Sequence, residues 1–118
     1  MARTPAALAK EPVGGEYANE AAFRRHVRYR ARALGWKLYE VPNSIMAHSS
    51  GFPDLYLAHP GRGVAAFAEC KTNTGRYTAD QSEWFDTLIR VGALVFLWRP
   101  NGAAGINDFL EGTGEWAR

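Results

Sequence analysis

The stretch GFPDLYLAHPGRGVAAFAECKTN, residues 51–73, contains two strand-like runs that carry charged residues where a buried strand is expected to be apolar. The first run, residues 54–58, begins with Asp54, and the second, residues 64–71, ends in Glu69-Cys70-Lys71. The sequence between them, His-Pro-Gly-Arg-Gly, is typical of a turn. Because the connection is short, we expect the two runs to be neighbouring antiparallel strands.

Alternation along the second run divides its side chains between the two faces of a sheet. One face carries Phe67, Glu69 and Lys71, and the other carries Ala66, Ala68 and Cys70. An antiparallel hairpin brings the start of one strand to the end of the next, so Asp54 is expected to approach Glu69. Glu69 and Lys71 could be only a local ion pair at a strand end.

Two carboxylates held together raise each other's pKa, which a fold rarely accepts without a cation between them. Hard oxygen ligands of this kind suit Mg²⁺ or Mn²⁺. Lys71 would then supply positive charge to an attacking water or to a transition-state oxygen. The hairpin therefore predicts a metal site at the ends of its two strands.

A helix is predicted before this hairpin, between the N-cap residue Asn19 and the helix-stopping Gly35. Apolar residues recur in it at helical spacing and predict one buried stripe: Phe23, Val27, Ala31 and Leu34. Extending the stripe back by three residues reaches Glu20, which puts a carboxylate on the core-facing side at the helix start. The favourable interaction of acids with the helix dipole is an alternative explanation for Glu20.

A second helix is predicted after the hairpin, where Thr78 and Gln81 have the spacing of a capping box. Its apolar stripe is expected to be buried and consists of Trp84, Phe85, Leu88 and Val91. Gln81 lies at the N-terminal end of that stripe, so it is a second polar residue on an otherwise apolar face.

Two further strands are predicted at residues 36–41 and 93–98, and a last short helix at residues 106–110. The core order is therefore helix, strand, strand, strand, helix, strand. This order predicts a small α/β domain with a mixed β-sheet flanked by helices. A helix that connects two strands implies a right-handed crossover, so residues 64–71 and 93–98 should be parallel.

The composition is that of an ordinary globular protein, with 118 residues, 47% hydrophobic and 22% charged. We expect a loose tail over residues 1–15, although Ala-Ala-Leu-Ala-Lys could form a helical turn, and a single domain over residues 16–118. The single cysteine excludes an internal disulfide framework and suits a reducing compartment such as the cytoplasm. No apolar stretch approaches the roughly 18 residues of a membrane helix, and the N-terminus lacks the pattern of a signal peptide.

Five arginines crowd into nine residues: Arg24, Arg25, Arg28, Arg30 and Arg32. The run could be a solvated helix face or a phosphate-binding surface. Steps of three and four residues align Arg25, Arg28 and Arg32 away from the apolar stripe, so these three are the candidates for phosphate contacts.

Two polar loops hold further candidates for contact with nucleic acid: His48 and Ser49 before the hairpin, and Arg76 and Tyr77 after it. A plain solvated loop is the alternative for both. The two remaining histidines, His26 and His59, are expected on the surface.

Pro53-Asp54 followed by Glu69-Cys70-Lys71, on this order of elements, resembles the PD-(D/E)XK nuclease superfamily. Gly51-Phe52-Pro53-Asp54-Leu55, the segment from Thr78 to Gln81, and Trp84 further resemble the VRR-NUC family. That family is the virus-type replication-repair nuclease module, found alone in phages and bacteria and as a domain of larger repair enzymes. The resemblance covers roughly residues 16–112.

The resemblance implies a restriction-endonuclease-like core whose site holds one or two Mg²⁺ ions, for which Mn²⁺ should substitute. The implied ligands are Asp54, Glu69, the backbone carbonyl of Cys70, and Glu20. Lys71 is implied to orient or activate the attacking water, and Gln81 to position Lys71 or that water by hydrogen bonding.

The implied activity is metal-dependent endonucleolytic hydrolysis of DNA, in the cytoplasm of a bacterium or a phage-infected cell. Stand-alone modules of the family tend to be homodimers acting on branched DNA, so a homodimer that cleaves four-way (Holliday) junctions is the favoured interpretation. The alternatives are a monomeric nuclease for flaps or for junctions of single strand and duplex, and a non-catalytic DNA-binding module of the same fold. A restriction-type enzyme is disfavoured because so short a chain leaves little room for a base-reading element.

Apolar residues also gather in the C-terminal part of the chain: Phe96, Trp98, Ile106, Phe109 and Leu110. They could form a dimer surface, or they could pack the last helix onto its own sheet.

Overall fold

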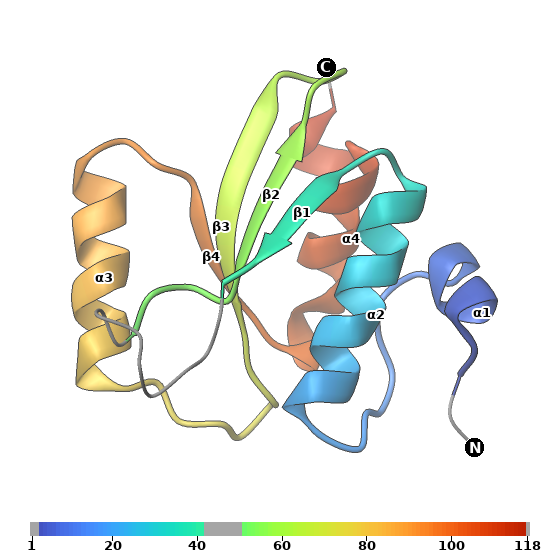
Figure 1. Ribbon diagram of the computed structural model, residues 1–118, viewed down its shortest axis with the longest axis horizontal. Coiled ribbons are helices and arrows are strands. Elements are labelled where there is room, and N and C mark those ends of the chain that lie inside the picture. The colour runs from blue at the N-terminus through green and yellow to red at the C-terminus, as the bar shows by residue number, and fades with distance from the viewer. Residues whose placement is uncertain (1–2, 42–50, 118) are drawn as a thin grey trace.

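A four-stranded mixed β-sheet with helices on both faces forms the protein (Figure 1). The structure is a computed structural model that describes residues 3–41 and 51–117. The helices and strands in chain order are α1 Pro5–Lys10, α2 Glu20–Ala33, β1 Lys37–Glu40, β2 Leu55–His59, β3 Val64–Cys70, α3 Ala79–Arg90, β4 Val95–Trp98 and α4 Ala103–Glu111. Short 3-10 helices precede α4 at Pro100–Gly102 and follow it at Gly114–Trp116. The predicted α/β class and the predicted order from α2 to β4 are confirmed.

The strands lie in the order β1-β2-β3-β4. The β1–β2 and β2–β3 pairs are antiparallel and the β3–β4 pair is parallel, as the hairpin and the crossover helix predict. In the hairpin, Leu55 lies opposite Ala68 and His59 opposite Val64. Continuing this register by one residue places Asp54 opposite Glu69.

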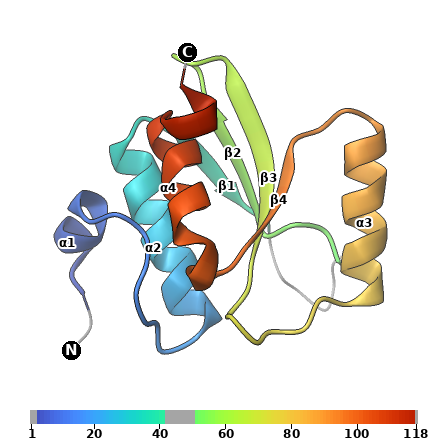
Figure 2. The ribbon, with the colours of Figure 1, turned by 180° about the vertical axis from the view of Figure 1, so that it is seen from behind.

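One face of the sheet is covered by α2 and α4, and α3 lies on the other side (Figures 1 and 2). The core fills the space between the sheet and the helix pair. Its main members are Leu55, Leu57, Ala66, Ala68 and Cys70 from the strands, Phe23, Val27 and Ala31 from α2, and Ile106, Phe109 and Leu110 from α4. Because Cys70 points into this core, its neighbours Glu69 and Lys71 belong to the face on the α3 side.

The N-terminal segment differs from the expected loose tail. Residues 5–10 form α1, which packs along the outer side of α2, and both Leu8 and Val13 are 3% exposed. The helix starts with a cap in which Thr4 Oγ1 accepts a hydrogen bond from the amide of Ala7. Tertiary burial of Leu8 stabilises a helix that is too short to persist alone.

His26 is a second correction, because it is fully buried rather than on the surface. Its Nδ1 lies 2.7 Å from the hydroxyl of Tyr17 and its Nε2 lies 3.0 Å from the carbonyl oxygen of Glu11. Burial lowers the pKa of this imidazole, and the nearby Arg3 lowers it further. The buried ring thus ties the segment after α1 to α2.

Helix α3 is much less buried than its apolar stripe predicts. Leu88 is buried, but Trp84 and Phe85 are only partly covered and Val91 is 74% exposed. Gly51, which adopts φ +84°, lies so close to the start of α3 that a Cβ there would overlap the backbone carbonyl of Asp80. Phe52 packs nearby, with its ring 4.9 Å from that of Trp84.

The C-terminal apolar residues belong to the core. Ile106, Phe109 and Leu110 are each 1% exposed, Trp98 is 5% exposed, and Phe96 packs against the same cluster. Their use as a dimer surface is therefore excluded, because α4 covers its own sheet. No helix in residues 3–41 and 51–117 is long and apolar enough to cross a membrane.

Candidate active site

Two carboxylates meet where β2 begins and β3 ends. The amide of Asp54 donates to Oε1 of Glu69 over 3.2 Å, and the amide of Cys70 donates to Oδ2 of Asp54 over 2.9 Å. The backbone at the start of β2 thus binds the side chain of Glu69, and the backbone at the end of β3 binds the side chain of Asp54. The hairpin register holds both carboxyl groups at one place.

Burial and mutual repulsion disfavour the charged forms of these two acids. Glu69 is 3% exposed, and its burial together with the charge of Asp54 raises its pKa to about 8, although Lys71 acts in the opposite direction. Burial also raises the pKa of Asp54, against the lowering effects of the Cys70 amide and of Arg24. A bound cation would therefore stabilise the charged forms of both acids.

Lys71 and Gln81 both reach Glu69. Lys71 Nζ lies 3.7 Å from Oε2 of Glu69, and Nε2 of Gln81 donates to the same oxygen over 3.1 Å. Gln81 also completes the capping box of α3, because its Oε1 accepts from the amide of Thr78 over 2.9 Å. With its oxygen used by the cap, the Gln81 amide presents only its nitrogen to Glu69.

Glu20 joins the site through Arg24, a residue that is not among the three arginines selected from the sequence pattern. Arg24 Nη1 lies 3.3 Å from Oε2 of Glu20 and 3.8 Å from Oδ2 of Asp54. The negative charge of Glu20 contributes to raising the pKa of both Asp54 and Glu69. The i,i+4 spacing of Glu20 and Arg24 was the available sequence signal for this contact.

Within residues 3–41 and 51–117, no three side chains of His, Cys, Asp or Glu are arranged to hold a metal ion by themselves. The donor chemistry nevertheless fits a hard cation, because the buried carboxyl group of Glu69 and the partly buried one of Asp54 lie together and both have raised pKa values. The backbone of Cys70 adds to this set. Its amide faces Asp54, and in an extended strand the carbonyl of a residue points to the same side as its amide. The Cys70 thiol itself lies in the core, where burial raises its pKa.

The VRR-NUC domain pattern matches residues 16–100, which span α2, the whole sheet and α3. The chain belongs to the VRR-NUC family. Neither a curated protein nor a solved structure matches the chain. Membership implies a core of the PD-(D/E)XK type and a nuclease activity with DNA as substrate, and nucleases of this kind typically need a divalent metal.

The VRR-NUC match also includes the loop between β3 and α3, which holds Arg76 and Tyr77. Both are exposed. The Tyr77 hydroxyl lies 3.4 Å from the carbonyl oxygen of Gln81, and burial together with the charge of Glu69 raises its pKa. Tyr77 therefore lies at the edge of the carboxylate pair. His48 and Ser49 fall outside the described residues.

The three arginines predicted to contact phosphate differ in the bonds that they already make within the protein. Arg28 Nη1 lies 2.6 Å from Oε1 of Glu40, and Arg25 Nη1 donates to the carbonyl of Arg3 over 3.2 Å. Arg32 is exposed near the end of α2. Arg25 and Arg28, but not Arg32, border a cleft of about 490 Å³, which is lined by Ala21, Arg24, Arg25, Arg28, Glu40, Val41 and Asp54.

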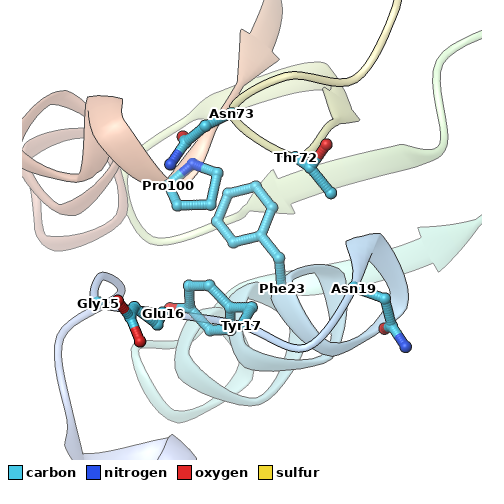
Figure 3. Close-up of a pocket in the computed structure, with 8 residues that line it drawn as sticks. All are labelled: Gly15, Glu16, Tyr17, Asn19, Phe23, Thr72, Asn73 and Pro100. Carbon is cyan, nitrogen blue, oxygen red and sulfur yellow. The ribbon is translucent and has the colours of Figure 1, made fainter.

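A second pocket of the VRR-NUC domain, of about 250 Å³, lies between the segment before α2 and the loop after Lys71. Figure 3 shows the ring of Phe23 between Tyr17 on one side and Thr72 and Pro100 on the other. Glu16 lines this pocket, whereas Asp54 and Glu69 do not. The carboxylate pair instead borders the arginine-lined cleft through Asp54.

Proposed function

We propose that this protein is a divalent-metal-dependent endonuclease that hydrolyses phosphodiester bonds in DNA. The observation that carries the proposal is the convergence of Glu69, which is buried, and Asp54, whose side chain is 18% exposed; the pKa values of both acids are raised. Such a pair is costly in a metal-free protein, and a bound dication would remove most of the cost. Family membership supports the same chemistry.

The proposed metal ligands are Asp54, Glu69 and the carbonyl of Cys70, with Glu20 completing the set from α2. Mg²⁺ is the expected ion and Mn²⁺ should substitute, because both prefer carboxylate and carbonyl oxygens. The chemistry supplied by such an ion is a lowered pKa of water and neutralisation of charge on the phosphoryl group.

The remaining polar residues would act on the water and on the carboxylates. Lys71 is the proposed residue that orients or activates the attacking water, because its ammonium group lies at the buried end of β3 with a side chain only 12% exposed. Gln81 would hold Glu69 in one orientation through the hydrogen bond from Nε2. Because Lys71 and Gln81 share one oxygen of Glu69, the position of each depends on that carboxylate.

A cleavage assay tests this proposal. Four-way junction, flap and linear duplex DNA are incubated with the protein in Mg²⁺, Mn²⁺ or EDTA, and cleavage is expected only with metal. Asp54→Asn and Glu69→Gln should each lower the rate by at least about 100-fold while the circular dichroism spectrum is retained. Glu83→Gln removes an exposed carboxylate of α3 and should leave the rate unchanged. Full activity of either site variant would refute the assignment, and tight DNA binding without cleavage would favour the non-catalytic module.

Branched DNA and a homodimer complete the proposal. A four-way junction has two-fold symmetric arms, so paired cuts require two active sites, and one chain offers one carboxylate pair in its described residues. A symmetric dimer supplies the second site most simply. The alternative is a monomeric nuclease acting on flaps, and the choice of substrate in the same assay separates the two.

A further inference from the structure

Arg24 is held between two acids of the candidate metal site. Its guanidinium touches Glu20 at 3.3 Å and approaches Asp54 at 3.8 Å. The second distance exceeds that of a hydrogen bond, so the contact with Asp54 is purely electrostatic. A single fixed positive charge thus offsets acids from α2 and from the start of β2.

The ion pairs of Arg24 can be broken at little cost in stability. Its side chain is 28% exposed and that of Glu20 is 39% exposed. Exposed ion pairs spaced i,i+4 on a helix contribute little to stability. Lys71, by contrast, is 12% exposed and lies on the Glu69 side of the pair. The two cations therefore flank the acids from opposite sides, and Arg24 is the more exposed of them.

The cleft beside Asp54 offers Arg24 another place to bind. Arg24 lines it together with Arg25 and Arg28. An arginine cannot serve as a proton acceptor at neutral pH, but its planar fork suits bidentate contact with phosphate. A phosphate in this cleft would lie next to the carboxylate pair, since Asp54 forms part of the same wall.

We propose that Arg24 acts as an exchangeable cation, which holds Glu20 and Asp54 in the metal-free protein and binds a phosphate of the DNA strand once a divalent ion has taken those carboxylates. This inference rests on the proposed function and adds to it a residue and a phosphate subsite. Metal and Arg24 compete for the same acids, so removing Arg24 strengthens metal binding. Arg24 also contributes to DNA binding, so removing it weakens that step.

Removal of Arg24 should therefore change the affinity for metal and the affinity for DNA in opposite directions, and two binding measurements test this. Binding of Mn²⁺ to the DNA-free protein is measured by calorimetry for wild type, Arg24→Gln and Arg90→Gln. Arg90 lies on α3 with a side chain 79% exposed and is paired with Asp86, so its variant controls for the loss of one positive charge. Arg24→Gln is expected to bind Mn²⁺ several-fold more tightly than wild type, whereas Arg90→Gln should match wild type.

Binding of junction and linear DNA is measured next, in Ca²⁺ to prevent cleavage. Arg24→Gln should bind DNA several-fold more weakly, and its salt slope should fall by about one. Arg24→Lys retains the charge but not the bidentate fork, so its Mn²⁺ affinity should stay near that of wild type.

Each outcome bears on the inference. A variant that binds both Mn²⁺ and DNA more weakly would show a purely structural role for Arg24 and overturn the inference, while the proposed function would stand if the wild type still cleaves DNA. Unchanged Mn²⁺ affinity would overturn it as well. A wild type that binds no Mn²⁺ and cuts no DNA would overturn the proposed function and this inference together.

Discussion

Glu69 combines nearly complete burial with several polar interactions at its carboxylate. Oε1 accepts from the amide of Asp54, and Oε2 lies within reach of Lys71 and Gln81, while the carboxyl group of Asp54 repels it. Donors stabilise the charged form and repulsion opposes it, and burial decides the balance in favour of the protonated form. The raised pKa of Glu69 favours its protonated form when no metal is bound.

In the metal-free protein, the free energy of unfolding should depend on pH through Glu69. The pKa of Glu69 is raised in the folded state from 4.5 to about 8, so its favourable contribution is complete below pH 4.5 and is lost as the pH rises towards 8. Glu69→Gln cannot ionise and should therefore gain stability relative to wild type between pH 5 and pH 8. Because one pKa unit corresponds to about 1.4 kcal/mol, we expect a relative gain of more than about 1 kcal/mol.

Urea unfolding in EDTA at the two pH values measures this gain. Glu83→Gln, an exposed carboxylate on α3, is the matched control and should show no such pH dependence relative to wild type. A stability difference between Glu69→Gln and wild type that is the same at both pH values would contradict the raised pKa.

Helix α2 packs one face into the core and presents charged residues at the candidate site. Its apolar stripe of Phe23, Val27 and Ala31 forms the core with the sheet. Its first two turns bring Glu20 and Arg24 to the carboxylate pair, and Arg25 and Arg28 line the adjoining cleft. A strand of DNA that runs along α2 would therefore pass directly from arginines to acids.

We predict that three arginines of α2 contribute to DNA affinity by binding phosphates. Replacing Arg25, Arg28 and Arg32 by Gln should lower the slope of log affinity against log salt by about one for each phosphate that is no longer bound. Arg32 should give the cleanest effect, because Arg28 must first leave Glu40 and Arg25 must leave the Arg3 carbonyl. Fluorescence anisotropy over a range of salt concentrations measures the slope, with Arg90→Gln as the control. A slope unchanged in the triple variant would identify α2 as a plain solvated face.

Local sequence signals predict some elements of the fold but not those that depend on tertiary packing. The hairpin, α2 and the cap of α3 follow from local signals, namely turn residues, spacing and capping pairs, and these were predictable. The sequence allows a helical turn at Ala-Ala-Leu-Ala-Lys but does not predict the packing of α1, because the stability of this helix comes from the burial of Leu8, which no local pattern reveals. The exposure of Val91 was missed because an apolar stripe does not show how far a helix extends beyond the sheet that it covers.

The site was predictable to the extent that it depends on strand register. Asp54 and Glu69 were expected to meet because hairpin geometry leaves little choice. Arg24 was not expected there, since its placement depends on how α2 crosses the strand ends, and that is a property of tertiary packing.

At the scale of the whole molecule, the distribution of apolar surface bears on assembly. The cluster first considered for a dimer interface is core. The larger apolar side chains that remain exposed are Tyr39, Tyr56, Tyr77, Ile89 and Val91 among the described residues. They lie on β1, on β2, on the loop before α3, on α3 itself and, for Val91, at the cap that ends α3.

We predict that the protein is a dimer in solution, because symmetric cleavage of a junction requires two sites. Light scattering at micromolar concentration should give twice the 13.1 kDa mass of one chain. A strict monomer that still makes paired symmetric cuts would defeat this reasoning. A strict monomer active on flaps alone would instead establish the flap-nuclease alternative.

The double use of the Gln81 side chain links the acidic site to the local opening of a helix end. One amide caps α3 through its oxygen and binds Glu69 through its nitrogen. The first turn of α3 therefore cannot fray without withdrawing a donor from Glu69, and the backbone amide of Thr78 loses its acceptor in the same event. Hydrogen exchange at that amide is thus governed by the same opening that removes the Gln81 donor from Glu69, so a backbone proton outside β2 and β3 reports on a contact of the acid pair.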